Sequence, residues 1–223
     1  MVISEKKPFE EILEYLKDAK KVVILGCSLC ATVCRVGGEP EVLEMKKKLE
    51  ENGKQVLGYK ILDPACNYMQ VRKDLKGLKQ ELSEADAVIS LACGDGTQTI
   101  AKLTDIPAYP GNNTMFIGEV ERVGQYEEVC LACGNCQLGW TGGICPVTKC
   151  SKGLLNGPCG GATKDGKCEV KPEHDCAWIQ IYEKLKKLNK LDNLEVIREP
   201  RNYAINVHPN RIDLKDVCNK CTL

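Results

Sequence analysis

The sequence has no excess of either charge, no long apolar run and few histidines. Its 31 basic and 31 acidic residues cancel to a formal net charge of zero. This argues against a nucleic-acid-binding surface, because contacts to phosphates need a basic excess. Apolar runs such as 22–25 and 87–92 are too short to cross a membrane. The first residues lack the apolar core and small-residue cleavage site of a signal peptide, so we expect a cytoplasmic protein.

Cysteine is the residue in excess, with 15 among 223 residues, whereas histidine occurs only as His174 and His208. Two histidines cannot form a histidine-rich metal site, so any bound metal must be held by thiolates. A disulfide framework is disfavoured, because a reducing cytosol keeps thiols free and an odd number of cysteines cannot fully pair. Zinc and iron–sulfur clusters remain as the two chemistries to consider. No grouping of serine, histidine and carboxylate indicates hydrolysis.

Up to residue 124 the chain alternates short β-branched runs with amphipathic segments. We expect strands at 21–26, 55–62, 87–92 and 114–120, and helices at 8–19, 39–52, 68–82 and 97–103. Strands that alternate with helices at intervals of about 30 residues indicate a parallel sheet with right-handed crossovers. Residues 1–124 are therefore predicted to form an α/β domain, an open parallel sheet with flanking helices of the Rossmann or flavodoxin-like kind.

Residues 125–223 lack the apolar periodicity of a normal core. Cysteine and glycine are dense between 127 and 175, and only 176–190 carries the apolar stripe of a helix. Beyond Leu191 the chain reads as an extended, irregular tail, whose apolar residues have no periodic core to join. We expect a small, irregular Cys-rich domain that is stabilised by metal, with one helix and a tail that packs on another subunit.

Five cysteines follow the ends of the first three predicted strands: Cys27, Cys30, Cys34, Cys66 and Cys93. The carboxyl ends of parallel strands share one edge of a sheet, where ligands bind, so we predict a metal site there. The alternative is that these residues are small buried hydrophobes, as free cysteines often are. Four thiolates satisfy a cubane cluster or a zinc ion, and Cys27 or Cys66 is the one to omit first. The C-x2-C-x3-C spacing reverses that of radical enzymes using S-adenosylmethionine, so that chemistry is not assigned.

A second set begins with Cys130, Cys133 and Cys136, the C-x2-C-x2-C run by which bacterial ferredoxins hold three corners of a cubane. Cys145 precedes a proline, as the remote fourth cysteine of a ferredoxin does. Zinc sites more often show two C-x2-C pairs, so an iron–sulfur cluster is favoured. Four later cysteines could hold a second cluster, bind zinc or share ligands with the first set; these are Cys150, Cys159, Cys168 and Cys176.

All thirteen of these cysteines are candidates for cofactor binding. Those favoured as direct metal ligands are Cys30, Cys34, Cys66, Cys93, Cys130, Cys133, Cys136, Cys145, Cys150 and Cys159. A terminal C-x2-C at Cys218 and Cys221 is either a half-site or an unliganded tail. Gly94 and Gly96 are similar to a phosphate-binding turn, but no full glycine-rich fingerprint accompanies them, so no nucleotide site is predicted.

The segment CLACGNCQLGWTGGICPVTKCSKGLLNGPCGG, followed by GKCEV and DCAWIQIYEKLKKLNKLD, resembles the C-terminal domain of methylenetetrahydrofolate reductase. In acetogens and related anaerobes that domain occurs in a small separate subunit, paired with a flavin-bearing catalytic subunit. The resemblance is strong over 130–192, and the N-terminal half looks like the same subunit. It implies an electron-transfer role and [4Fe-4S] clusters. Two clusters are expected, enough cysteines remain to hold a third, and zinc is the alternative at one site.

The resemblance places flavin, folate and the reduction of methylenetetrahydrofolate to methyltetrahydrofolate in the barrel of the partner. This chain shows no (β/α)8 repeat, so no catalytic residue is assigned to it. The expected partner is the flavin-containing catalytic subunit, with further redox subunits as optional members of the complex. The alternative is a zinc-binding scaffold of this or another enzyme complex, without a redox role.

Overall fold

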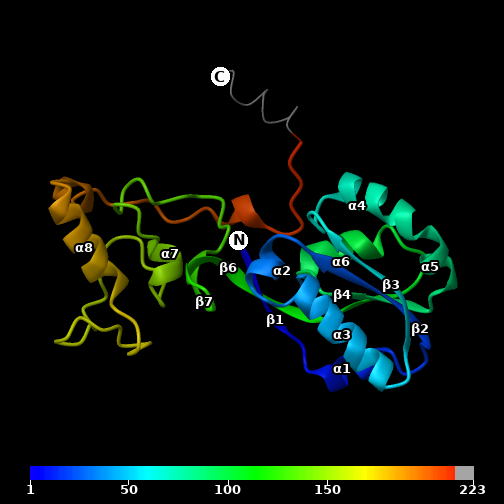
Figure 1. Cartoon of the computed structure of the whole chain (residues 1–223). Helices are drawn as coiled ribbons and strands as arrows, with labels where there is room; N and C mark the ends of the chain where they lie inside the picture. The colour runs from blue at the N-terminus through cyan, green and yellow to red at the C-terminus, as the bar shows by residue number, and fades with distance from the viewer. Residues whose placement is uncertain (214–223) are drawn as a thin grey trace. The chain divides into compact units, whose positions relative to one another are not determined.

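The computed structural model describes residues 1–213, and the chain divides into two compact units, Met1–Glu128 and Val129–Leu223 (Figure 1). The terminal pair Cys218 and Cys221 lies outside the described residues. Within residues 1–213, no helix combines the length and the apolar character needed to cross a membrane.

The first unit is built around a four-stranded parallel sheet, which confirms the predicted fold class. The strands are β2 (Lys21–Cys27), β3 (Gln55–Leu62), β4 (Ala87–Ser90) and β5 (Ala108–Pro110). They lie in the order β3-β2-β4-β5. From β2 the chain winds outward to β3 and then returns across β2 to β4. The winding therefore reverses between β2 and β4, and such a reversal is where open α/β sheets place their ligands.

Helices cover both faces of this sheet. They are α1 (Phe9–Tyr15), α2 (Cys30–Val33), α3 (Glu39–Glu51), α4 (Tyr68–Asp74), the 3-10 helix η1 (Leu75–Leu78), α5 (Lys79–Glu84) and α6 (Gly94–Ala101). The single helix expected at 68–82 is thus divided into α4, η1 and α5. Gly77 lies in η1, and the ammonium group of Lys60 donates to the carbonyl of Asp74 at 3.2 Å.

The alternation of side chains along β2 explains the two layers. Successive residues of a strand point to opposite faces. Val22 and Ile24 are buried in one cluster with residues of α1 and α3. Val23 and Leu25 are buried in another cluster with residues of α4, η1 and α6. A strand that is apolar on both faces is typical of a sheet covered on both sides, which is the arrangement drawn in Figure 1.

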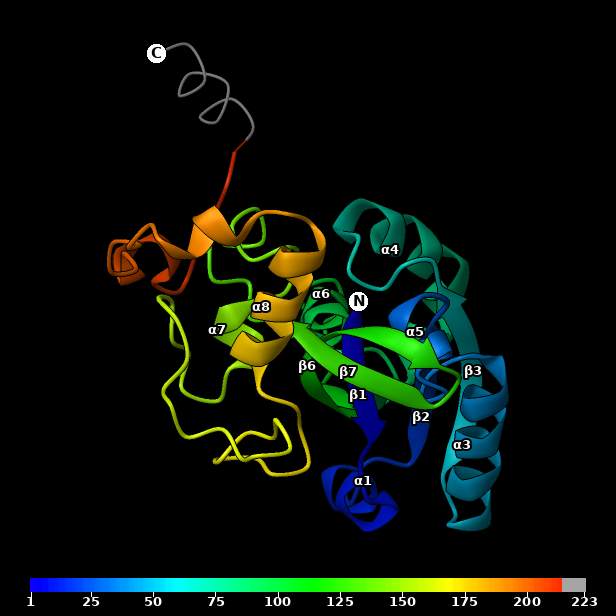
Figure 2. The same cartoon turned by 90° about the vertical axis from the view of Figure 1, so that its left-hand side faces the viewer.

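A separate three-stranded sheet, which the sequence did not predict, has the order β1-β6-β7 (Figure 2). Its strands are β1 (Val2–Lys6), β6 (Asn112–Arg122) and β7 (Gln125–Cys130). The expectation for 114–120 was wrong in its pairing: the segment is a strand, but it runs antiparallel to β1. The fourth parallel strand is β5, whose three residues are too short to give a pattern of their own.

The second unit has little regular structure. Its described residues, 129–213, contain α7 (Pro146–Lys149), α8 (Ala177–Lys187) and two 3-10 turns, η2 (Leu191–Leu194) and η3 (Tyr203–Asn206). Helix α8 buries Trp178, Ile181 and Leu185, which form the only apolar cluster of buried residues found in the described part of this unit. The tail beyond Leu191 is therefore not wholly extended, because η2 and η3 lie within it.

Candidate metal-binding sites

The carboxyl edge of the parallel sheet gathers all five N-terminal cysteines. Cys27 is the last residue of β2, and Cys30 and Cys34 begin and cap α2. Cys66 lies in the turn after β3, and Cys93 caps α6 after β4. Cys27 and Cys93 thus stand on either side of the reversal in winding, the position at which such sheets bind ligands. That these thiols hold a metal stays a prediction.

Electrostatic effects between these thiols indicate that they are neighbours. Burial raises the pKa of the Cys34 thiol, and the sulfurs of Cys30 and Cys93 raise it further. Burial also raises the pKa of Cys66, and Asp95, Cys27 and Cys93 add to that effect. Cys93 acts on both thiols and is therefore their common neighbour. Clustered thiolates repel one another unless a cation neutralises them, which is what a bound metal does.

Two contacts hold the loops of the sheet edge together. The hydroxyl of Ser28, after β2, donates to Oδ1 of Asp63, after β3, at 2.6 Å. Gly96 lies against the turn that carries Cys66, since a Cβ at this position would come within 2.8 Å of the Cβ of Ala65. The close approach of α6 to that turn thus explains the glycine at position 96.

The second sheet supports α2. The hydroxyl of Tyr126, in β7, donates to the carbonyl of Val33 at 2.9 Å. The thiol of Cys34 lies 3.8 Å from the carbonyl oxygen of Val2, in β1. Strands that are distant in sequence therefore fix the short helix that carries two of the five cysteines.

Asn112 is a positioning residue that the sequence analysis missed. Only 4% of its surface is exposed. Its Nδ2 donates to the carbonyl of Leu91 at 2.7 Å and lies 3.3 Å and 3.4 Å from the carbonyl oxygens of Val36 and Ala92. It ties the segment after α2 to the end of β4, beside Cys93. No motif marks it, because its partners are backbone atoms.

We expect Asn112→Leu to lower the free energy of unfolding by about 2 kcal/mol or more, because buried carbonyls would lose their donor. Chemical denaturation followed by circular dichroism measures this change. The matched control is Asn113→Leu at the exposed neighbouring position, which should shift the free energy by less than about 0.5 kcal/mol. Equal effects of the two substitutions would remove the assigned role of Asn112.

The C-x2-C-x2-C loop is shaped by left-handed residues. Ala132 has a φ of 50° and Gly134 a φ of 76°. The turn at Ala132 lets its N–H donate to Sγ of Cys130 at 3.3 Å. Cys133 places its thiol 3.6 Å from the carbonyl of Asn135. Cys130 and Cys136 are exposed, whereas Cys133 is partly buried. The three cysteines of this loop therefore differ in their exposure to solvent.

The tail covers this loop. Nδ2 of Asn206 donates to the carbonyl of Ala132 at 2.8 Å. Ile205 lies over Gly134, where an added Cβ would come within 2.7 Å of its Cγ2. This part of the tail packs on its own unit, whereas the sequence analysis assigned the tail to another subunit.

The four later cysteines, which spacing could not assign, line one small hollow: Cys150, Cys159, Cys168 and Cys176. A short hairpin brings the last two together. The N–H of Cys168 donates to the carbonyl of His174 and that of Cys176 to the carbonyl of Gly166, at 2.9 and 2.8 Å. Cys145 caps α7, and its thiol lies 3.6 Å from Oγ1 of Thr148.

Several of these sulfurs accept hydrogen bonds from the backbone. The N–H groups of Lys171 and Val170 lower the pKa of Cys168, together with the hydroxyl of Ser151. The N–H of Gly161 donates to Sγ of Cys159 at 3.4 Å. With Cys130, three cysteines thus accept an N–H from the residue two positions later. Such bonds favour the thiolate, and in iron–sulfur proteins they tune the reduction potential.

The donor chemistry fits a metal held by thiolates. The thirteen cysteines of residues 1–213 are free thiols. Among these residues, no three His, Cys, Asp or Glu side chains already stand in a metal-binding geometry. Soft sulfur donors select iron–sulfur clusters or zinc over harder cations. The structure therefore supports two groups of candidate ligands, one at the sheet edge and one in the second unit.

Comparison with protein families gives one match, over residues 109–204, to the family described as Methylene-tetrahydrofolate reductase C terminal. No curated protein and no solved structure matches the chain. The match begins within β5, covers β6 and β7, and includes all eight cysteines between 130 and 176. The five cysteines of the sheet edge precede it. Residues 109–204 of this chain are thus similar to the C-terminal region of methylenetetrahydrofolate reductase.

Proposed function

We propose that this chain is an iron–sulfur electron-transfer subunit of a methylenetetrahydrofolate reductase. It would pass electrons to the flavin of a catalytic partner that reduces methylenetetrahydrofolate to methyltetrahydrofolate. The observation that carries the proposal is the gathering of free cysteines into two groups, beside a match to a reductase family. Thiolate-held clusters are one-electron carriers, and electron transfer needs a series of such centres.

The chain's own residues have two tasks in this proposal. The sheet edge positions up to five thiols on a rigid scaffold, and the backbone N–H groups beside Cys130, Cys159 and Cys168 stabilise their charged sulfurs. A bound cluster supplies the redox chemistry. Exposed apolar residues of the tail are suited to contact the catalytic partner; they include Ile197, Tyr203, Val207 and Ile212.

A zinc-binding scaffold is the second candidate. The observation that favours it is the hollow lined by Cys150, Cys159, Cys168 and Cys176, because four cysteines are a common ligand set of structural zinc. In that case the chain would support the catalytic subunit without carrying electrons. A chain that binds zinc in this hollow and a cluster at the sheet edge would also agree with the electron-transfer proposal.

Anaerobic purification followed by iron, sulfide and zinc analysis separates the two candidates. A cluster protein is brown with broad absorption near ~400 nm, whereas a zinc protein is colourless. We expect equal amounts of iron and sulfide, and bleaching of the absorption on addition of a low-potential donor. A colourless protein that contains only zinc would overturn the electron-transfer role.

Mixing experiments test the division of labour. The isolated, flavin-free chain should reduce no methylenetetrahydrofolate, even with its clusters reduced. Addition of the flavin subunit should reoxidise those clusters and reduce the flavin, as measured by stopped-flow absorption. Folate reduction by the isolated chain, or no electron transfer within a complex that forms, would contradict the proposal.

A further inference from the structure

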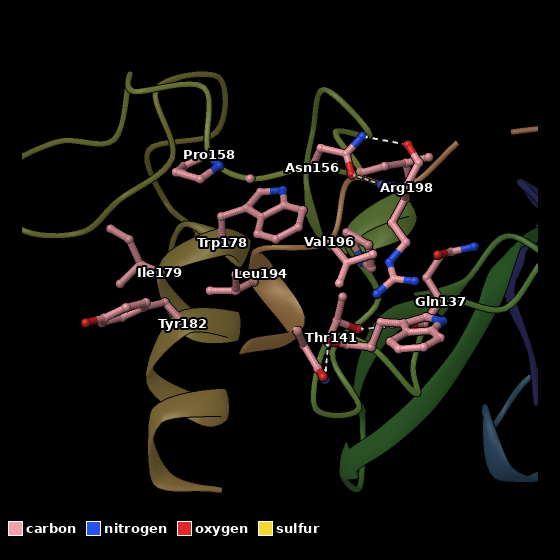
Figure 3. A pocket seen from close by; sticks show the side chains of 15 residues that line it. Gln137, Thr141, Asn156, Pro158, Trp178, Ile179, Tyr182, Leu194, Val196 and Arg198 are labelled. Carbon is pink, nitrogen blue, oxygen red and sulfur yellow. Dashed lines mark hydrogen bonds between the residues drawn. The ribbon is translucent and has the colours of Figure 1, made fainter. Parts of the chain in front are cut away.

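A cavity in the second unit is lined by none of the cysteines that the structure describes. It has a volume of about 400 Å³ and lies between α8, residues 155–158 and residues 193–198 (Figure 3). Figure 3 shows Trp178 and Tyr182 projecting from α8 on one side, with Val196 and Arg198 on the other. A volume of this size is typical of small-molecule sites.

The walls are aromatic and aliphatic, and their polar groups are largely engaged with the protein. Both tryptophans of the chain, Trp140 and Trp178, line the cavity. Nε1 of Trp178 donates to the carbonyl of Leu154 at 3.1 Å. Oγ1 of Thr141 donates to the carbonyl of Gln137 at 3.2 Å. The cavity therefore offers flat apolar surfaces more than free hydrogen-bonding groups.

Arg198 is the exception. Its guanidinium carbon lies 3.5 Å from the centre of the Trp140 ring. Its Nη2 is buried and has no hydrogen-bond partner among the described residues. The N–H edge of a guanidinium matches the two oxygens of a carboxylate. Arg198 is also the only charged residue among those that line the cavity.

The backbone of Arg198 is held in place by one side chain. Nδ2 of Asn156 donates to the carbonyl of Arg198 at 2.9 Å, and the N–H of Arg198 donates to Oδ1 of Asn156 at 2.7 Å. The side chain of Asn156 thus pairs with both backbone groups of this residue, as Figure 3 shows. The guanidinium is therefore positioned before any ligand arrives, which lowers the entropic cost of binding.

We propose that this cavity binds a flat aromatic molecule that carries one carboxylate. The aromatic body would lie between the walls formed by α8 and by Trp140. The carboxylate would accept hydrogen bonds from the guanidinium of Arg198. The match to a single negative charge follows from the single cation in the cavity and from the absence of acidic side chains in its lining. The proposal does not depend on the electron-transfer role.

Calorimetric titration of the full chain with 2-naphthoate and with neutral 2-naphthamide tests the proposal. Both probes have the same aromatic body, so their difference isolates the carboxylate. We expect saturable binding of naphthoate and roughly tenfold weaker binding of naphthamide, the ratio that a charge-assisted hydrogen bond provides. Absence of saturable naphthoate binding, or equal affinity for the two probes, would overturn the proposal without affecting the proposed function.

Arg198→Gln should reduce the affinity for naphthoate about tenfold and leave that for naphthamide unchanged. The matched control is Arg201→Gln. Arg201 also stacks on an aromatic ring, that of Tyr203 at 4.9 Å, but does not line the cavity. An equal loss of naphthoate binding in both variants would contradict the assignment. Circular dichroism of each variant confirms that the chain is folded.

Discussion

Exchange of Cys93 for alanine is expected to remove the iron of the sheet-edge site, about four atoms per chain for a cubane cluster. Cys93 caps α6 after β4, beside the reversal in winding, and acts electrostatically on both Cys34 and Cys66. Iron and sulfide analysis of the anaerobic protein measures the loss, with the absorption near ~400 nm as a second readout.

Two further variants make this result specific. Val33 lies at an exposed position of α2, between Cys30 and Cys34, and Val33→Ala should retain all the iron. Cys27→Ala should also retain it, because Cys27 packs into the apolar cluster of the sheet and five candidates compete for four positions. Full iron content in Cys93→Ala, with normal circular dichroism, would show that no cluster is held at this edge.

The sheet and its cysteine-bearing edge could be predicted because their signals are local. Burial on both faces makes β2 and β4 continuous apolar runs, and a strand's end is visible where that run stops. The bounds of β3 were predicted without error. Once parallel strands are assigned, their carboxyl ends must meet, so Cys27, Cys66 and Cys93 are brought to one edge by topology alone.

Long-range pairing could not be predicted in the same way. Val2 of β1 pairs with Ile117 of β6, and neither segment carries a sequence signal that identifies its partner. The mostly exposed pattern of β6 does not indicate whether its neighbour in the sheet is parallel or antiparallel. Asn112 and Tyr126 act on backbone carbonyls, which carry no sequence signature. A single sequence indicates which residues form strands more reliably than it indicates their partners.

The second unit escapes prediction for a different reason. Its loops are shaped by residues with positive φ, such as Ala132 and Gly134, and not by an apolar period. That Cys150 and Cys176 line the same hollow therefore could not be predicted from their spacing in the sequence. The stacking of Arg198 on Trp140 likewise joins positions 58 residues apart within irregular chain.

Loss of the metal from the second unit is expected to unfold residues 129–176 and to leave the first unit intact. The apolar cluster of buried residues in this unit consists of Trp178, Ile181 and Leu185, all on α8. The loop of Cys130 and Cys136 exposes both thiols and buries no apolar residue of its own. With so little apolar area removed from water, we expect metal binding to supply most of the folding free energy of this segment.

Cys133→Ala tests this dependence, because it removes the central thiol of the C-x2-C-x2-C loop. The iron content should fall by about one cluster, and limited proteolysis should cut near Trp140 at a rate at least about tenfold above that of the unsubstituted chain. Mass spectrometry should still recover a resistant fragment of the first unit, whose sheet is covered on both faces by its own helices. Leu131→Ala, at an exposed position in the same loop, should change neither the iron content nor the cleavage rate. Unchanged iron and unchanged proteolysis in Cys133→Ala would show that this loop holds no metal, and the folding of the second unit would then have to rest on α8 and the tail that packs beside it.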